Sequence, residues 1–285
     1  MSTTSKSPRK VLEVAYLVGG CALNDYSHEF SPKKFTQPQL FACLVLKEFL
    51  QFDYRKLAAL LCDTPDLCRV IGLEVVPHFT TFQKAARRLL QLSSAERLLG
   101  KTLRLAQVVG RLPSRINLAA GDGTGWESHH VSQYFIKRRN QRGKCFRRTS
   151  FTKFPKAGVL CDTASHLILA VVPERGPGPD INHLQPLLDQ GLRRLPIDTL
   201  ALDAGYDAEH VHHYAREERG VRTLIPPKIG RPTEKPPSSY WRRQMAARLH
   251  LTRYTQRWQV ETVNSMLKRL LDSALRARTY WSVTD

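Results

Sequence analysis

The stretch Tyr254–Lys268, YTQRWQVETVNSMLK, contains good helix formers and neither Gly nor Pro. It predicts one helix of about four turns. At 3.6 residues per turn, one face carries two bases, a phenol and a carboxylate: Tyr254, Arg257, Glu261 and Lys268. The opposite stripe is apolar and is expected to face a core: Trp258, Val263, Met266 and Leu270. The lone acid suggests either a metal ligand beside a polyanion or a solvated ion pair between Glu261 and Arg257.

The composition favours a polyanion as the partner. The chain has 285 residues, of which 42% are hydrophobic, so it can bury a large core and form two domains. Lys and Arg number 44 against 25 acids, and the formal charge is +19. An excess of this size is typical of proteins that bind nucleic acid. No segment reads as a membrane span or a signal peptide, so no membrane partner is expected.

The first part of the chain predicts an all-helical domain over residues 1–112. Thr36 and Asp53 precede apolar helical patterns and are expected to be N-caps. Phe82–Leu92 predicts an amphipathic helix with its basic residues outward. The short turns resemble helix-turn-helix arrangements, so we interpret this domain as DNA-binding. The alternative is a plain helical domain with ordinary surface charge.

Two aspartates in the second part stand where a predicted strand meets a glycine. The run Ile116–Gly121 ends in Asp122-Gly123, and the run Ile197–Leu202 ends at Asp203, before Ala204-Gly205. Ligand sites in α/β sheets lie outside the carboxyl ends of strands. The element order expected from residue 116 onward is β-β-β-α-β-α-β-α, a mixed sheet flanked by helices. Asp122 alone could equally belong to an Asp-Gly turn.

Asp122, Asp203 and Glu261 could converge on one site. Three carboxylates brought together repel one another, and divalent cations relieve that repulsion. Ligands that are all oxygens suit Mg²⁺ or Mn²⁺. Two ions about 3.5–4 Å apart would activate a water or hydroxyl and stabilise the leaving oxygen of a phosphodiester. The histidines at 210, 212 and 213 are expected at the surface.

A basic track follows the first aspartate, with no acid between Glu127 and Asp162. It contains cations interleaved with aromatic residues, which is typical of a nucleic-acid contact: Lys137, Arg138, Arg139, Arg142, Lys144, Arg147, Arg148, Lys153 and Lys156. A solvated loop is the alternative. Two further strands, Lys156–Cys161 and Leu167–Val172, are expected to form an antiparallel meander with the first.

At this point the residues resemble a known family. Tyr254-x2-Arg257-x3-Glu261-x6-Lys268 is similar to the YREK signature of DDE transposases of bacterial insertion sequences, in the insertion-sequence four and five groups. Gly121–Gly125 and Leu202–Asp207 resemble the first and second catalytic blocks of that family. The resemblance covers nearly the whole chain.

The resemblance implies an RNase H-like catalytic domain over residues 113–285, with a short basic insertion near 226–250. It implies Asp122, Asp203 and Glu261 as the catalytic, metal-binding triad, with Mg²⁺ or Mn²⁺ as cofactor. It also implies that Tyr254, Arg257 and Lys268 contact DNA near the cleaved end. The expected partners are double-stranded DNA, as terminal inverted repeats and target, and a second copy in a homodimer. The expected location is the bacterial cytoplasm, at the nucleoid.

The implied reaction is metal-dependent cleavage at the element's ends, followed by strand transfer into target DNA. The chain stops at Asp285, where members of the family commonly continue with a further helix. The alternatives are therefore a truncated, inactive DNA-binding remnant and a metal-dependent nuclease without strand transfer.

Overall fold

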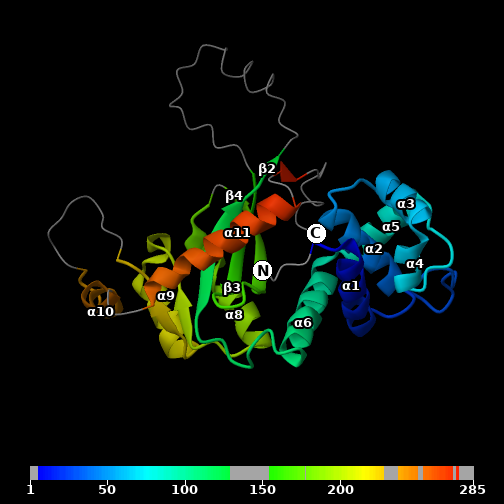
Figure 1. The fold of residues 1–285 in the computed structure, drawn as a ribbon. Helices are drawn as coiled ribbons and strands as arrows, with labels where there is room; N and C mark the ends of the chain where they lie inside the picture. The colour runs from blue at the N-terminus through cyan, green and yellow to red at the C-terminus, as the bar shows by residue number, and fades with distance from the viewer. Residues whose placement is uncertain are drawn as a thin grey trace, which may run out of the picture. The chain divides into compact units, whose positions relative to one another are not determined.

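The computed structural model describes residues 6–128, 154–176, 178–227, 237–249, 253–271 and 274–275. These residues form two compact units. The first runs to Val109 and includes Leu270 and Leu271, and the second runs from Gly110 to Arg269. Figure 1 shows the fold, coloured from the N-terminus to the C-terminus. Within the described part of the chain, no helix has the length and apolarity needed to span a bilayer.

The first unit is all helical. Its helices are α1 (Pro8–Ala22), α2 (Gln37–Phe49), α3 (Tyr54–Asp63), α4 (Pro65–Val70), α5 (Phe79–Leu89) and α6 (Leu92–Val108). Both predicted N-caps are confirmed. Thr36 forms a capping box with Gln39 at the start of α2, and the Asp53 side chain accepts from the Lys56 amide at 2.8 Å. The apolar stripes of these helices share one core, with Leu12, Leu57 and Phe82 fully buried.

The second unit is built on a five-stranded sheet of order β4-β3-β1-β5-β6. The strands are β1 (Ala119–Gly125), β3 (Phe154–Asp162), β4 (Ile168–Gly176), β5 (Thr199–Ala201) and β6 (Arg222–Leu224). The pairs β1–β3 and β3–β4 are antiparallel, and β1–β5 and β5–β6 are parallel. The predicted meander and the RNase H-like mixed sheet are therefore confirmed. Two further short strands, β2 (Glu127–Ser128) and β7 (Ala274–Leu275), pair in parallel with each other.

Helices cover both faces of this sheet. The helical segments are η1 (Asp180–His183), α8 (Leu184–Arg194), η2 (Ala204–Tyr206), α9 (Glu209–His213), η3 (Tyr214–Glu218), α10 (Tyr240–Arg248), η5 (Tyr254–Arg257) and α11 (Trp258–Leu271). Side chains alternate along each strand, so Ala120, Val159 and Cys161 form a core with α11. Gly121 and Leu160 face the other way, toward α8. Figure 1 shows α11 crossing the sheet.

The helix predicted over Tyr254–Lys268 differs from the prediction in two ways. Its first turn is the 3-10 segment η5, and the α-helix begins at Trp258. The predicted core stripe is also displaced. Trp258 is 56% exposed, whereas Val260 and Val263 are buried against the sheet. The reason is spacing: positions 260, 263, 264 and 267 repeat every three or four residues and form the stripe that meets Ala120 and Val159.

The prediction that His212 lies at the surface is wrong. Its side chain is fully buried, and its Nδ1 atom lies 2.6 Å from Thr223 Oγ1. Asp207 is equally buried nearby and binds the Arg242 guanidinium through two nitrogens, which docks α10 against this region. Burial lowers the pKa of His212 to about 4, and the nearby Arg216 charge acts in the same direction.

We expect this histidine to make the second unit acid-sensitive. Because the folded-state pKa lies below the ordinary value of 6.5, the unfolded chain binds the proton first as pH falls. Its contribution is therefore lost between about pH 6.5 and pH 4, up to ~3 kcal/mol. Urea unfolding at pH 7 and pH 4.5 measures the loss. His212→Asn should unfold with a shallower pH dependence than the wild type, whereas the matched change at the half-exposed His213 should not. Equal slopes for His212→Asn and wild type would refute this role.

Candidate active site

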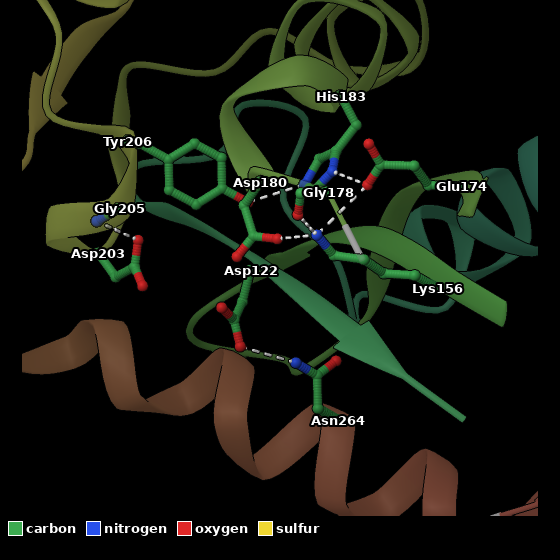
Figure 2. A network of polar contacts seen from close by, with 10 residues as sticks. All are labelled: Asp122, Lys156, Glu174, Gly178, Asp180, His183, Asp203, Gly205, Tyr206 and Asn264. Carbon is green, nitrogen blue, oxygen red and sulfur yellow. Dashed lines mark hydrogen bonds and ion pairs between the residues drawn. The ribbon is translucent and has the colours of Figure 1, made fainter. Parts of the chain in front are cut away.

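Asp122 stands in the middle of β1, on the face of the sheet that packs against α11. It lies opposite Val159 in the antiparallel register. The amide of Asn264 on α11 donates to Asp122 Oδ2 at 3.0 Å (Figure 2). Asn264 is only 7% exposed, and among the described residues nothing partners its Oδ1 atom. A hydrogen bond at the Asp122 carboxylate thus links α11 to β1.

Asp203 follows β5 at the position that matches Asp122. The parallel register aligns Ala120 with Ala201, and each aspartate comes two residues later. Its Oδ1 atom accepts from the Gly205 amide at 2.8 Å and so caps η2. Parallel strands end at the same edge of a sheet, which is why residues far apart in the chain come together here.

Asp180 is the third carboxylate of the site, and it is not among the site residues that the sequence predicted. It begins η1, directly after the loop that follows β4. One ligand oxygen from each of Asp122, Asp180 and Asp203 lies within 4.8 Å of the other two. All three side chains are partly buried. No period or motif in the sequence signals this residue, because its place depends on where η1 lies on the sheet.

The surroundings of Asp122 shift the pKa of its carboxyl group. Burial raises the pKa of its carboxyl to about 6. The Arg257 charge opposes this shift, and the negative charges of Asp203 and Asp180 add to it. A partly buried carboxylate beside other carboxylates binds a cation favourably, because the cation offsets the repulsion between their negative charges.

Glu261 is not in this cluster. Its side chain is 56% exposed and pairs with the Arg257 guanidinium one turn earlier. It stands one turn before Asn264 on α11, the residue that contacts Asp122. In the described structure the sequence-predicted set is therefore split: Asp122 and Asp203 are together, and Glu261 faces Arg257.

The other residues of the predicted signature lie around the cluster. Tyr254 packs against the apolar group of Leu118, Ala201 and Leu224, and burial raises the pKa of its phenol. Arg257 is 18% exposed at its side chain and is close enough to act on Asp122. Lys268 is partly buried near the end of α11.

The described residues include only one of the cations predicted for the basic track. Most of its predicted members lie outside them: Lys137, Arg138, Arg139, Arg142, Lys144, Arg147, Arg148 and Lys153. Lys156 is described, and its assignment to a DNA-facing track is wrong. It lies on β3 with its side chain 8% exposed and pairs with Asp180. A position near the end of a basic run does not reveal that a strand turns the side chain inward.

The donor set fits a hard divalent cation. Carboxylate oxygens are the preferred ligands of Mg²⁺ and Mn²⁺. Three of them converge, and both burial and the neighbouring carboxylates raise the pKa of Asp122, so a bound cation would stabilise its ionised form. Asp122 and Asp203 come from neighbouring parallel strands, which is a rigid support for such a site.

A mixed RNase H-like sheet whose two central strands bring carboxylates together defines a class of metal-dependent enzymes that act on phosphodiesters. The family model described as the transposase DDE domain matches residues 113–284, so the chain belongs to that family. It is a DDE transposase, an enzyme that uses divalent metal ions to cut DNA and to transfer the cut strand.

Solved structures that resemble the chain are also transposases. They are the Mos1 mariner paired-end complex with Mn (13% identity, TM-score 0.24), a Mos1 paired-end complex with the left transposon end (14%, 0.25) and a pre-cleavage Mos1 transpososome (13%, 0.25). The matches cover 93%, 88% and 89% of this chain and 86%, 82% and 83% of those chains. Among curated proteins, none matches the chain.

Proposed function

We propose that Asp122 and Asp203 hold the catalytic ions of this transposase, and that Glu261 joins them when metal and DNA bind. The observation that carries the proposal is the convergence of carboxylates from the middle of β1 and from just beyond the end of β5. The oxygen ligands suit Mg²⁺ or Mn²⁺, and we propose two ions. Bound ions would lower the pKa of a water and stabilise charge on the phosphate oxygens.

The chain's own residues would position the DNA. Arg257 and Tyr254 stand beside the carboxylates, so a phosphate brought to the metal would meet a guanidinium and a phenol. Lys268 and the basic track would extend this contact along the backbone of the DNA. The charge of +19 supports a large electrostatic share in binding. The all-helical first unit would supply further DNA contacts.

We further propose that the substrate is the pair of terminal inverted repeats of an insertion sequence, present with target DNA in a bacterial cytoplasm. An element has two ends, and one active site per end requires two copies of the chain. A homodimer on DNA is the assembly that meets this requirement.

The reaction can be tested on the full chain with labelled DNA that carries the repeats flanking its gene. With Mg²⁺ or Mn²⁺ we expect strand cleavage at the repeat and joining of the freed 3′-hydroxyl to a second duplex. Chelation of the metal should abolish both products. Asp203→Asn should bind DNA as well as the wild type and yield neither product, because the asparagine oxygen can still cap η2 while the charge of a proposed ligand is lost.

Each alternative function gives a different result in the same assay. Cleavage without joining would identify a nuclease. Salt-sensitive DNA binding without any metal-dependent cleavage would identify an inactive remnant. Equal cleavage by the wild type and Asp203→Asn would overturn the assignment of the site.

A further inference from the structure

Two glycines that are paired across β1 and β3 leave room on the sheet for η1. Gly123 on β1 and Gly158 on β3 are directly opposite in the antiparallel register, so their missing side chains would point the same way. A Cβ on Gly123 would lie 2.5 Å from Asp180 Oδ1, and one on Gly158 would overlap the His183 ring. The first and last residues of η1 therefore rest on positions where only glycine fits.

A buried ammonium group holds one end of that segment. Lys156 stands on β3, two residues before Gly158 and on the same face of the sheet. Its Nζ atom contacts the Asp180 carboxylate, lies 3.5 Å from Glu174 Oε2 and donates to the Gly178 carbonyl at 2.6 Å (Figure 2). A charge this buried needs partners, and Asp180 is one of them.

A histidine fixes the other end of η1. His183 Nδ1 lies 2.9 Å from Glu174 Oε2, and His183 Nε2 lies 2.8 Å from the Tyr206 hydroxyl. Because a carboxylate only accepts, Nδ1 carries the proton, and in the neutral ring Nε2 accepts from Tyr206. Tyr206 belongs to η2, the turn that Asp203 caps. The segments that carry Asp180 and Asp203 are thus joined.

We propose that Asp180 is a further ligand of the catalytic metal centre, and that Lys156 and the glycine pair are the positioning residues that place it. This rests on the proposed function of Asp122 and Asp203. A carboxylate has two oxygens, so the ion pair with Lys156 leaves one to bind a metal. In the absence of a divalent ion, Lys156 supplies the positive charge that keeps Asp180 beside the other carboxylates.

The alternative is that Asp180 serves only as the counter-ion of Lys156. Titration of the full chain with Mn²⁺, followed by electron paramagnetic resonance, separates the two roles without any activity measurement. Asp180→Asn keeps the shape and the acceptor oxygen for Lys156 but removes the charge. We expect it to weaken Mn²⁺ binding by at least tenfold, whereas a pure counter-ion would leave the affinity unchanged.

A second variant tests the placement without altering any charged group. Gly123→Ala would push the Asp180 carboxylate away, and we expect a loss of ~10-fold or more in Mn²⁺ affinity, the usual effect of disturbing the support of a ligand. Gly191→Ala on α8 is the matched control, because its Cβ would meet the Leu160 side chain and not Asp180 or Lys156. Circular dichroism checks that both variants fold.

Lys156→Met tests whether the lysine strengthens or weakens Mn²⁺ binding. We expect weaker Mn²⁺ binding, because Asp180 loses its anchor; tighter binding would mean that the ammonium competes with the metal and would overturn the positioning role.

The proposed function and the role of Asp180 can fail separately. If the wild type binds no Mn²⁺, the proposed function is wrong. If Asp122→Asn abolishes binding and Asp180→Asn does not change it, only the present inference is wrong.

Discussion

Asp122→Asn should inactivate the enzyme and at the same time stabilise the metal-free protein. Cleavage should fall by ~10³-fold or more, because a metal stabilises the charge of the reacting phosphate by several kcal/mol. Asparagine has the same shape, and its oxygen can still accept from Asn264. The loss would therefore reflect the missing charge rather than a disturbed strand.

The gain in stability follows from the pKa of Asp122. Burial raises it to about 6 from 3.8, so ionising this carboxyl costs more in the folded chain than in the unfolded one. The native state then loses stability as pH rises from about 4 through 6, by up to ~3 kcal/mol at pH 7. Asp122→Asn removes this cost.

Thermal unfolding in the presence of a chelator measures the effect. The midpoint of Asp122→Asn should exceed that of the wild type by several degrees at pH 7, and the difference should vanish near pH 4. Asp189→Asn is a suitable control, since that aspartate lies on α8, outside the cluster, and pairs with Arg219 and Tyr214. A variant less stable than the wild type at pH 7 would show that ionised Asp122 does not destabilise the folded chain.

Glu261→Gln is the second change with a large expected effect. In the described structure Glu261 pairs with Arg257, and the cluster is completed by Asp180. We expect Glu261→Gln to lower cleavage by ~10²-fold or more, since α11 already brings the next turn against Asp122 and the glutamate has only to leave Arg257. DNA affinity, measured by fluorescence anisotropy, should change little.

Arg257→Ala is the counterpart that separates chemistry from DNA contact. It should weaken DNA binding and reduce the salt dependence of the affinity by a slope of about 1, because one phosphate contact is lost. Equal losses for both variants, independent of metal, would contradict this division. Full cleavage by Glu261→Gln would leave Asp180 as the third carboxylate of the reaction.

Much of the fold was predictable because it depends on local chemistry. Thr36 and Asp53 cap helices wherever the following amides are free, and the apolar runs after Ile116 mark strands whatever they pair with. The same applies to Asp122 and Asp203, since an aspartate between a buried strand and a glycine indicates a site from a few residues. The burial of Trp258 and the exposure of His212 were predicted wrongly, because a helix period shows a stripe without showing what covers it.

The sequence by itself determined the family, the element order and two of the carboxylates, because these are encoded in short motifs and periods. Only the tertiary structure decided that Asp180 joins them, that Lys156 turns inward and that Glu261 pairs with Arg257. Those contacts depend on the register that sets Gly123 opposite Gly158 and on the packing of α11 across β1. Register and helix packing arise from long-range pairing, which no local window of sequence contains.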